Sequence, residues 1–167
     1  MQFTIALTTT LLSACALAIP TTTTPLGDDT LTYQIHDFTE RKYNGVNIST
    51  LFFDVVSAPS SNAHVNFQCA PYNPAVTIPA PTFEAGHVYF CAKDSPYSFS
   101  FVPGDVKTGA KAVLNLWQTV SEFKTYVGEV DFPEPDGCRT AGPGADTVCE
   151  AQGDYEIVLN PAGSSGQ

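Results

Sequence analysis

Apolar and polar residues alternate with a period of two through most of this chain. The clearest case is residues 97–101, where Tyr97, Phe99 and Phe101 alternate with Ser98 and Ser100. A period of two predicts β-strands with one buried and one wetted face, the pattern of antiparallel sheet. The same alternation predicts further strands at residues 31–35, 51–55, 65–69, 114–116, 123–132 and 155–159.

Turn signals separate these runs, and no window of eleven or more residues keeps a helical apolar stripe. The turns are rich in Gly, Pro, Asn and Ser and fall at Asn44-Gly45, 57–62, 71–81, 103–105 and 133–137. Many short strands in one domain indicate an all-β protein, either a single antiparallel β-barrel or a closed sandwich of about eight to eleven strands. We place this domain at residues 31–160. Closure would also hide the strand edges.

The first eighteen residues resemble a secretory signal peptide. They contain no charged side chain, include an apolar stretch and end in Ala16-Leu17-Ala18, which has small residues where signal peptidase cuts. The stretch is shorter than the roughly 20 apolar residues needed to cross a bilayer. We therefore expect a secreted, extracellular protein. Cleavage after Ala18 leaves 167 − 18 = 149 residues, enough for one domain.

Both ends of the remaining chain have the composition of flexible segments. Residues 19–30 form a Thr- and Pro-rich arm, with Thr21–Thr24 between Pro20 and Pro25. Residues 161–167 are rich in Gly and Ser, and we expect this tail to fray.

The strong acidity of the chain limits its partners. The formal net charge is −10 at pH 7. Such a field repels the phosphates of nucleic acid and of anionic lipids, so neither nucleic acid nor a membrane is expected as a partner.

Four cysteines remain after signal cleavage, because Cys15 leaves with the signal peptide. An even number in a secreted chain indicates two intrachain disulfides. Three pairings are possible; we favour Cys69–Cys91 with Cys138–Cys149, since each bridge then closes a local loop. Each would add roughly 3 kcal/mol in the chain-entropy model. A zinc site is the alternative, but the spacings are not of the short C-x-x-C kind.

The sequence offers no familiar catalytic or metal-binding motif. No Gly-x-Ser-x-Gly occurs, and the two disulfides would leave no cysteine as a nucleophile. No two of His36, His64 and His87 have the i, i+2 or i, i+4 spacing of metal ligands. We therefore expect no catalytic residues, no metal and no cofactor.

Two carboxylate pairs are candidate glycosidase groups, Glu129 with Asp131 and Asp28 with Asp29. Glu129 and Asp131 fall on one face of a predicted strand. Acid–base catalysis needs one carboxyl with a pKa raised by burial, whereas these two lie among polar residues. We expect both to be solvated and the protein not to be an enzyme.

Two surface features remain open in the sequence. Asn47-Ile48-Ser49 is an N-glycosylation sequon just after a predicted turn, which predicts a glycan on Asn47 if the side chain is exposed. A second set of large apolar residues lies on or between the strand faces, and we favour a core position over an exposed patch for it. Its members are Phe52, Val88, Phe90, Trp117 and Tyr126.

Several segments together resemble the major-allergen family of Alternaria, a group of secreted fungal β-barrel proteins that includes elicitors and effectors. The most specific is Cys138-Arg139 followed by Gly142, Gly144 and Val148-Cys149. The others are Ile35-His36-Asp37-Phe38-Thr39-Glu40-Arg41-Lys42, Leu51-Phe52-Phe53-Asp54-Val55, Val65-Asn66-Phe67-Gln68-Cys69, Val88-Tyr89-Phe90-Cys91, Ser98-Phe99-Ser100-Phe101 and Asp154-Tyr155-Glu156-Ile157-Val158-Leu159. The resemblance covers residues 31–160.

The resemblance implies an antiparallel β-barrel with the two sequential disulfides. It also implies an effector or elicitor that acts on plant defence through protein–protein contact, with host proteins such as pathogenesis-related thaumatin-like proteins as partners, and with allergen potential. A flavonoid-type phenolic ligand is the alternative that it implies. Within residues 35–42 it assigns an IgE-binding surface to Ile35, Asp37, Phe38, Arg41 and Lys42.

One departure from the family bears on assembly. The family's founding member dimerises through a cysteine near its mature N-terminus, and residues 21–30 contain none. We therefore expect a monomer or a non-covalent dimer.

Overall fold

Ten strands and no helix make up the described part of the chain in the computed structural model, which describes residues 30–43, 45–59, 64–75, 83–140, 142 and 145–163. The predicted signal peptide, residues 19–29 of the arm and residues 164–167 of the tail lie outside these residues. The strands are β1 (Leu31–Tyr43), β2 (Asn47–Ser57), β3 (Asn66–Cys69), β4 (Tyr89–Phe90), β5 (Tyr97–Val102), β6 (Ala112–Ser121), β7 (Lys124–Phe132), β8 (Gly137–Thr140), β9 (Thr147–Glu150) and β10 (Tyr155–Pro161).

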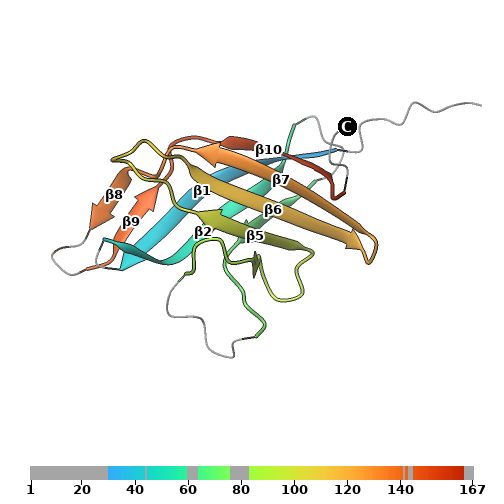
Figure 1. Cartoon of the computed structure of the whole chain (residues 1–167), viewed down its shortest axis with the longest axis horizontal. Coiled ribbons are helices and arrows are strands. Elements are labelled where there is room, and N and C mark those ends of the chain that lie inside the picture. Colours follow the sequence, from blue (N-terminus) through green and yellow to red (C-terminus); the bar gives the residue numbers. More distant parts are fainter. Residues whose placement is uncertain are drawn as a thin grey trace, which may run out of the picture.

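The strands form one antiparallel sheet that curls into a nearly closed barrel. Its order is β3-β2-β1-β10-β7-β6-β5-β4. In Figure 1, β7, β6 and β5 lie in front of β1 and β2. The first half of β1 pairs with β10 and its second half with β9, which carries β8 as a hairpin beyond the barrel. The predicted antiparallel barrel is therefore confirmed.

The seam of the barrel lies between β3 and β4, and a disulfide joins its two sides. Cys69 at the end of β3 is bonded to Cys91, which follows β4. Tyr72 and Phe90 exchange two backbone hydrogen bonds of 2.8 and 2.9 Å beside it. This pairing and the Cys138–Cys149 bridge confirm the sequential connectivity.

Aromatic rings fill the barrel interior. Phe38 lies at the centre, with its ring centroid 4.9 Å from that of Phe101 and 4.8 Å from that of Phe132. Phe53 and Phe99 meet edge to face at 5.2 Å. All five side chains are at most 1% exposed, so they form the centre of the core. The period-two pattern predicted Phe53, Phe99 and Phe101 at such positions, but not Phe38.

A bulge in β1 explains why this strand is longer than the sequence pattern indicated. The register with β2 shifts between His36 and Thr39, and Asp37 has a φ of 50°. The extra residue turns Phe38 inward and resets the alternation, so Glu40 also points into the barrel. The apolar period therefore stops at Ile35, although the strand continues to Tyr43.

The second apolar set lies mostly outside the core, which corrects our prediction. Only Tyr126 is buried, at 4% exposure, whereas Val88 is 50% and Phe90 42% exposed. Phe52 and Trp117 are half-buried. Both take outward positions on their strands.

The C-terminal boundary lies slightly beyond residue 160. Pro161 pairs with Tyr126, and the Ala162 amide donates a 2.7 Å hydrogen bond to the Thr125 carbonyl. Among the described residues, no helix has the length and apolar character needed to cross a membrane.

Candidate functional site

Three segments distant in sequence meet at one end of the barrel. Strand β1 contributes Glu40 and Lys42, which lie on the same side of the strand because they are two residues apart. The linker between β7 and β8 contributes Glu134, and the loop between β5 and β6 contributes Gly104. We call Glu40, Lys42 and Glu134 the ionic cluster.

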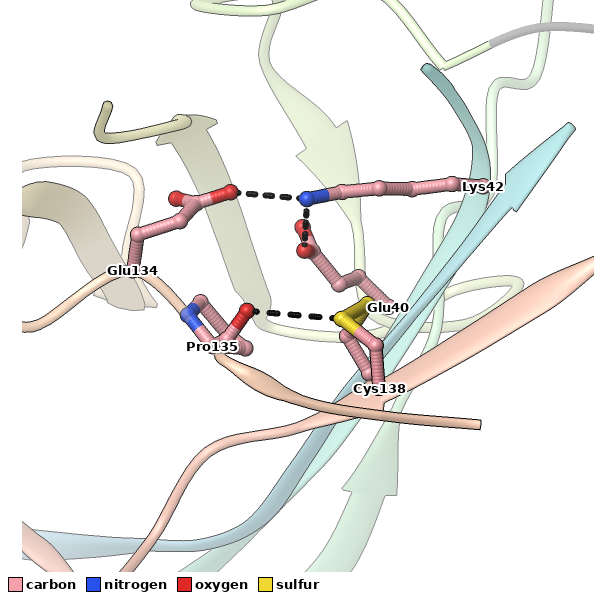
Figure 2. Close-up of a disulfide and its surroundings, with 6 residues drawn as sticks. Glu40, Lys42, Glu134, Pro135 and Cys138 are labelled. Atoms are coloured by element: carbon pink, nitrogen blue, oxygen red, sulfur yellow. Dashed lines mark hydrogen bonds and ion pairs between the residues drawn. A yellow bond between two sulfur atoms is a disulfide. The ribbon is translucent and has the colours of Figure 1, made fainter. Parts of the chain in front are cut away.

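The Lys42 ammonium lies between the two carboxylates of the cluster, as Figure 2 shows. Its Nζ is 2.5 Å from Glu40 Oε1 and donates a 2.9 Å hydrogen bond to Glu134 Oε1. Glu134 Oε2 accepts a 2.6 Å hydrogen bond from the Gly104 amide. The side chains of Lys42, Glu134 and Glu40 are 15%, 7% and 0% exposed. The Lys42 ammonium thus ties the end of β1 to the linker, and the Glu134 carboxylate ties the linker to the β5–β6 loop.

Glu40 is the least satisfied member of the ionic cluster. Among the described residues, neither of its carboxylate oxygens has a hydrogen-bond partner of good geometry, although the ammonium is close. Burial raises the pKa of Glu40 to about 7, and the nearby Glu134 charge adds to this, while Lys42 opposes it. Glu40 therefore takes up or releases a proton near neutral pH.

Lys42 stays a cation at neutral pH, where Glu40 exchanges its proton. Burial alone would lower its pKa, but its contacts with Glu40 and Glu134 outweigh burial and raise the pKa. A permanently protonated ammonium has no free electron pair, so Lys42 cannot act as an amine nucleophile. The cluster can hold charge and protons and can anchor chain segments.

An open hollow of about 440 Å³ borders the ionic cluster. Lys42 and Glu134 form its polar side. Its apolar wall consists of Val46, Ile48, Phe83, Ala85 and Pro103. A mixed lining of this size suits a small molecule with an apolar body and a hydrogen-bonding group.

The predicted glycosylation residue lies at the rim of this hollow. Asn47 is exposed at the first position of β2 and is one of the lining residues. Ser49 Oγ, the third residue of the sequon, donates a 3.0 Å hydrogen bond to the Arg41 carbonyl. A glycan on Asn47 stays a prediction, and it would project beside the opening.

The segment predicted as an IgE surface is not a continuous surface, because the bulge turns part of it inward. Ile35 and Phe38 are 0% and 1% exposed and belong to the core. Lys42 is held in the ionic cluster. Of the five predicted residues, only Asp37 and Arg41 are exposed. An antibody that binds this segment in the folded protein would contact mainly those two.

The three histidines lie apart from each other in the fold. His36 on β1 is 3.2 Å from Asp154, His64 precedes β3, and His87 packs against Tyr89 at 4.7 Å between centroids. In the described part of the chain, no three His, Cys, Asp or Glu side chains gather as metal ligands would.

The carboxylates considered for catalysis are exposed, as expected. Glu129 and Asp131 both face solvent on β7, and Asp131 pairs at 3.4 Å with Lys111 across the sheet. They therefore lack the burial that acid–base catalysis by a carboxyl pair needs. The ionic cluster, which has that burial, was missed, because Glu40 lies in a polar run and Glu134 lies 94 positions further on in a turn segment.

The second disulfide lies beside the cluster. Cys138 and Cys149 face each other across the β8–β9 hairpin. Figure 2 shows Cys138 next to Glu40. Cys149 is also opposite Glu40 on β1. The Cys138 sulfur is 3.7 Å from the Pro135 carbonyl oxygen, so the bridge packs against the linker that carries Glu134.

These features define a class of protein: a small antiparallel β-barrel, stapled by two disulfides, with a buried ion pair and a hollow at one end. Disulfides are typical of extracellular proteins. The sequence matches no family model and no curated protein.

Two solved structures are similar to this chain. A crystal structure of the Alternaria alternata allergen Alt a 1 has a TM-score of 0.61 at 28% sequence identity, over 84% of this chain and 94% of that chain. A second, of the Alternaria alternata major allergen Alt a 1, has a TM-score of 0.60 at 26% identity, over 78% and 94%. The chain is therefore similar in fold and sequence to the Alt a 1 allergens, and this similarity supports the resemblance drawn from the sequence.

Proposed function

We propose that this protein is a secreted effector or elicitor that acts on plant defence by protein–protein contact, and that it is not an enzyme. The observation that carries the proposal is an outer barrel face, formed by β4, β5, β6, β7 and β10, that presents a row of apolar and uncharged side chains together with the carboxylates of Glu129 and Asp131. We call it the outer face.

The strand register defines the outer face. Phe90 is opposite Ser98, which is opposite Trp117, then Val127 and then Asn160, so these side chains form one row. A second row runs from Val102 to Val113 and ends at Asp131. Phe90 and Val102 are 42% and 44% exposed.

The chemistry of the outer face suits a protein partner. Its aromatic and valine side chains are held by a rigid sheet, and such anchors carry most of the energy in protein interfaces. The exposed carboxylates of Glu129 and Asp131 lie on β7 within this face. A partner with an apolar centre and basic residues around it would complement this surface. Pathogenesis-related thaumatin-like proteins of the host are the candidates to screen.

Leaf infiltration tests the proposal. The purified protein with intact disulfides should cause necrosis or an oxidative burst, and a reduced and alkylated sample should not, because recognition needs the folded surface. A Phe90→Lys/Val127→Lys variant should lose the response. A Val120→Lys/Phe123→Lys variant changes exposed apolar residues at the β6–β7 turn, 56% and 96% exposed, and should keep it.

Two results would count against this function. If the folded outer-face variant acts as strongly as the wild type, the outer face is not the recognition surface. If the wild-type protein causes no response and also fails to suppress the response to a known elicitor, the effector role is wrong. Circular dichroism of each variant would show that its fold is retained.

A carrier of small phenolic, flavonoid-type ligands is the second candidate, and the 440 Å³ hollow favours it. Trp117 lies on the outer face and not among the lining residues, so its fluorescence is a poor probe. Calorimetric titration with a flavonoid is more direct. Phe83→Ala should weaken binding and Phe123→Ala should not; equal affinity in both would remove the hollow as the site.

A further inference from the structure

We propose that the ionic cluster is a proton-controlled latch. While Glu40 is protonated, the cluster holds the end of β1, the β5–β6 loop and the β7–β8 linker together. When Glu40 ionises, the contacts between these three segments weaken. The inference is independent of the proposed function.

The charge count of the cluster carries the argument. Two carboxylates share one ammonium in a place where the side chains are between 0% and 15% exposed. With Glu40 neutral, the Lys42–Glu134 pair is balanced. With Glu40 ionised, one negative charge is left without compensation away from water, which is costly.

No other charge in the described structure relieves this imbalance. Lys42 is the one cation shown to face Glu40, and Glu134 is the second anion. The strands that flank β1 contribute Leu51 from β2 and Cys149 from β9 opposite Glu40. Leu51 carries no charge, and Cys149 is held in a disulfide and does not titrate.

The hydrogen bonds of the ionic cluster link the protonation of Glu40 to the surrounding segments. Lys42 Nζ holds Glu134 Oε1 at 2.9 Å, and Glu134 Oε2 accepts the Gly104 amide at 2.6 Å. When Glu40 ionises, it competes for the same ammonium and repels Glu134. The linker and the β5–β6 loop then lose a shared anchor, and the hollow lined by Lys42, Gly104 and Glu134 changes in charge and width.

The raised pKa of Glu40, about 7, supports this direction of the pH dependence. Below that pH Glu40 is mostly protonated and the latch is closed. Above it the latch is loosened, so a shift from mildly acidic to mildly alkaline surroundings would open this end of the barrel.

Hydrogen exchange followed by NMR tests the latch on the full mature protein. After correction for intrinsic exchange chemistry, the Gly104 amide should exchange about tenfold faster at pH 8.5 than at pH 5.5 in the wild type. Glu40→Gln mimics the protonated carboxyl, so its corrected rate should change less than about twofold. Glu150→Gln, an exposed carboxylate on β9 paired with Arg139, should behave as the wild type.

Two results would overturn the proposal: a Glu40→Gln protein that keeps the wild-type pH response, or a wild-type Gly104 amide without one. A carbon-13 titration of the Glu40 carboxyl in the wild type decides the matter if Glu40→Gln does not fold. A midpoint near 7 with a parallel change at Gly104 supports the latch, and a midpoint near the ordinary 4.5 refutes it.

Discussion

Lys42 and Glu134 are separated by 92 residues in the chain and by 2.9 Å in the fold. Their ion pair joins the β1 end to the linker that leads to the β8–β9 hairpin. In the described structure β1 pairs with β2, β9 and β10, so this contact connects it to a linker between two strands with which it does not pair. Its position beside both a buried carboxylate and the hollow makes it the most informative point for mutation.

Removing the shared cation should destabilise the protein strongly. In Lys42→Met, Glu40 and Glu134 remain at the barrel end without their ammonium, and breaking a buried pair costs about 3 kcal/mol or more. Urea unfolding would measure this. Lys111→Met breaks an exposed pair with Asp131 and should cost less than about 1 kcal/mol. Equal effects of the two variants would contradict a structural role for the cluster.

Stability should fall as pH rises through neutrality. The pKa of Glu40 is about 7 in the fold and 4.5 for an ordinary glutamate, so the folded state binds more protons between these values. The contribution is complete below about pH 4.5 and is lost as pH rises through about 7, by roughly 3 kcal/mol. Thermal unfolding from pH 4.5 to 9 would measure it, with a flatter profile in Glu40→Gln. Lys42 adds a loss only at strongly alkaline pH.

The seam disulfide should be the more important of the two for barrel closure. Cys69→Ala/Cys91→Ala removes the covalent link between β3 and β4 and should cost about 3 kcal/mol, with faster amide exchange at Tyr72 and Phe90. Cys138→Ala/Cys149→Ala should loosen the β8–β9 hairpin and leave the seam amides protected. Unchanged seam exchange in the first variant would show that backbone pairing alone closes the barrel.

Two phenylalanines of opposite exposure should respond very differently to truncation. Phe38→Ala empties the centre of the aromatic core and should cost about 3–5 kcal/mol. Phe123→Ala, at a turn where the side chain is 96% exposed, should change the free energy of unfolding by less than about 0.5 kcal/mol. A small effect at Phe38, measured by urea unfolding, would contradict the packing described for it.

Gly128 should not tolerate a side chain. A Cβ at this position on β7 would lie 2.4 Å from the Val158 carbonyl oxygen on β10, which is too close for any rearrangement of a side chain to relieve. Gly128→Ala should therefore separate β7 from β10 locally and destabilise the protein by about 1–3 kcal/mol. Normal stability together with unchanged β10 amide exchange would contradict this close approach.

The sequence was sufficient for the fold wherever strands keep a strict alternation. Residues 97–101 became β5 with Tyr97, Phe99 and Phe101 inside, as predicted. In β1 the pattern failed after Ile35, because a bulge at Asp37 shifts the phase and no propensity rule marks its position. Phe90 was placed in the core for a similar reason: alternation gives two faces but does not say which one a closed barrel covers.

The disulfides and the ionic cluster differ in how far local signals reveal them. Local loop closure was enough to choose the cysteine pairing. Glu40 and Lys42 alternate in a way that places them on one side of a strand, but the inward direction depends on the bulge. Glu134 joins them only through the three-dimensional path of the β7–β8 linker, which spacing in the sequence does not encode.

The disulfide across the seam has a consequence for proteolysis. The chain between Cys69 and Cys91 is a loop whose two ends are covalently joined to each other and paired into the barrel wall at β3 and β4. A protease that cuts a single bond inside this loop adds one water molecule and releases no fragment. The nicked protein would migrate as one species without reductant and as two with it, and its barrel could survive the cut.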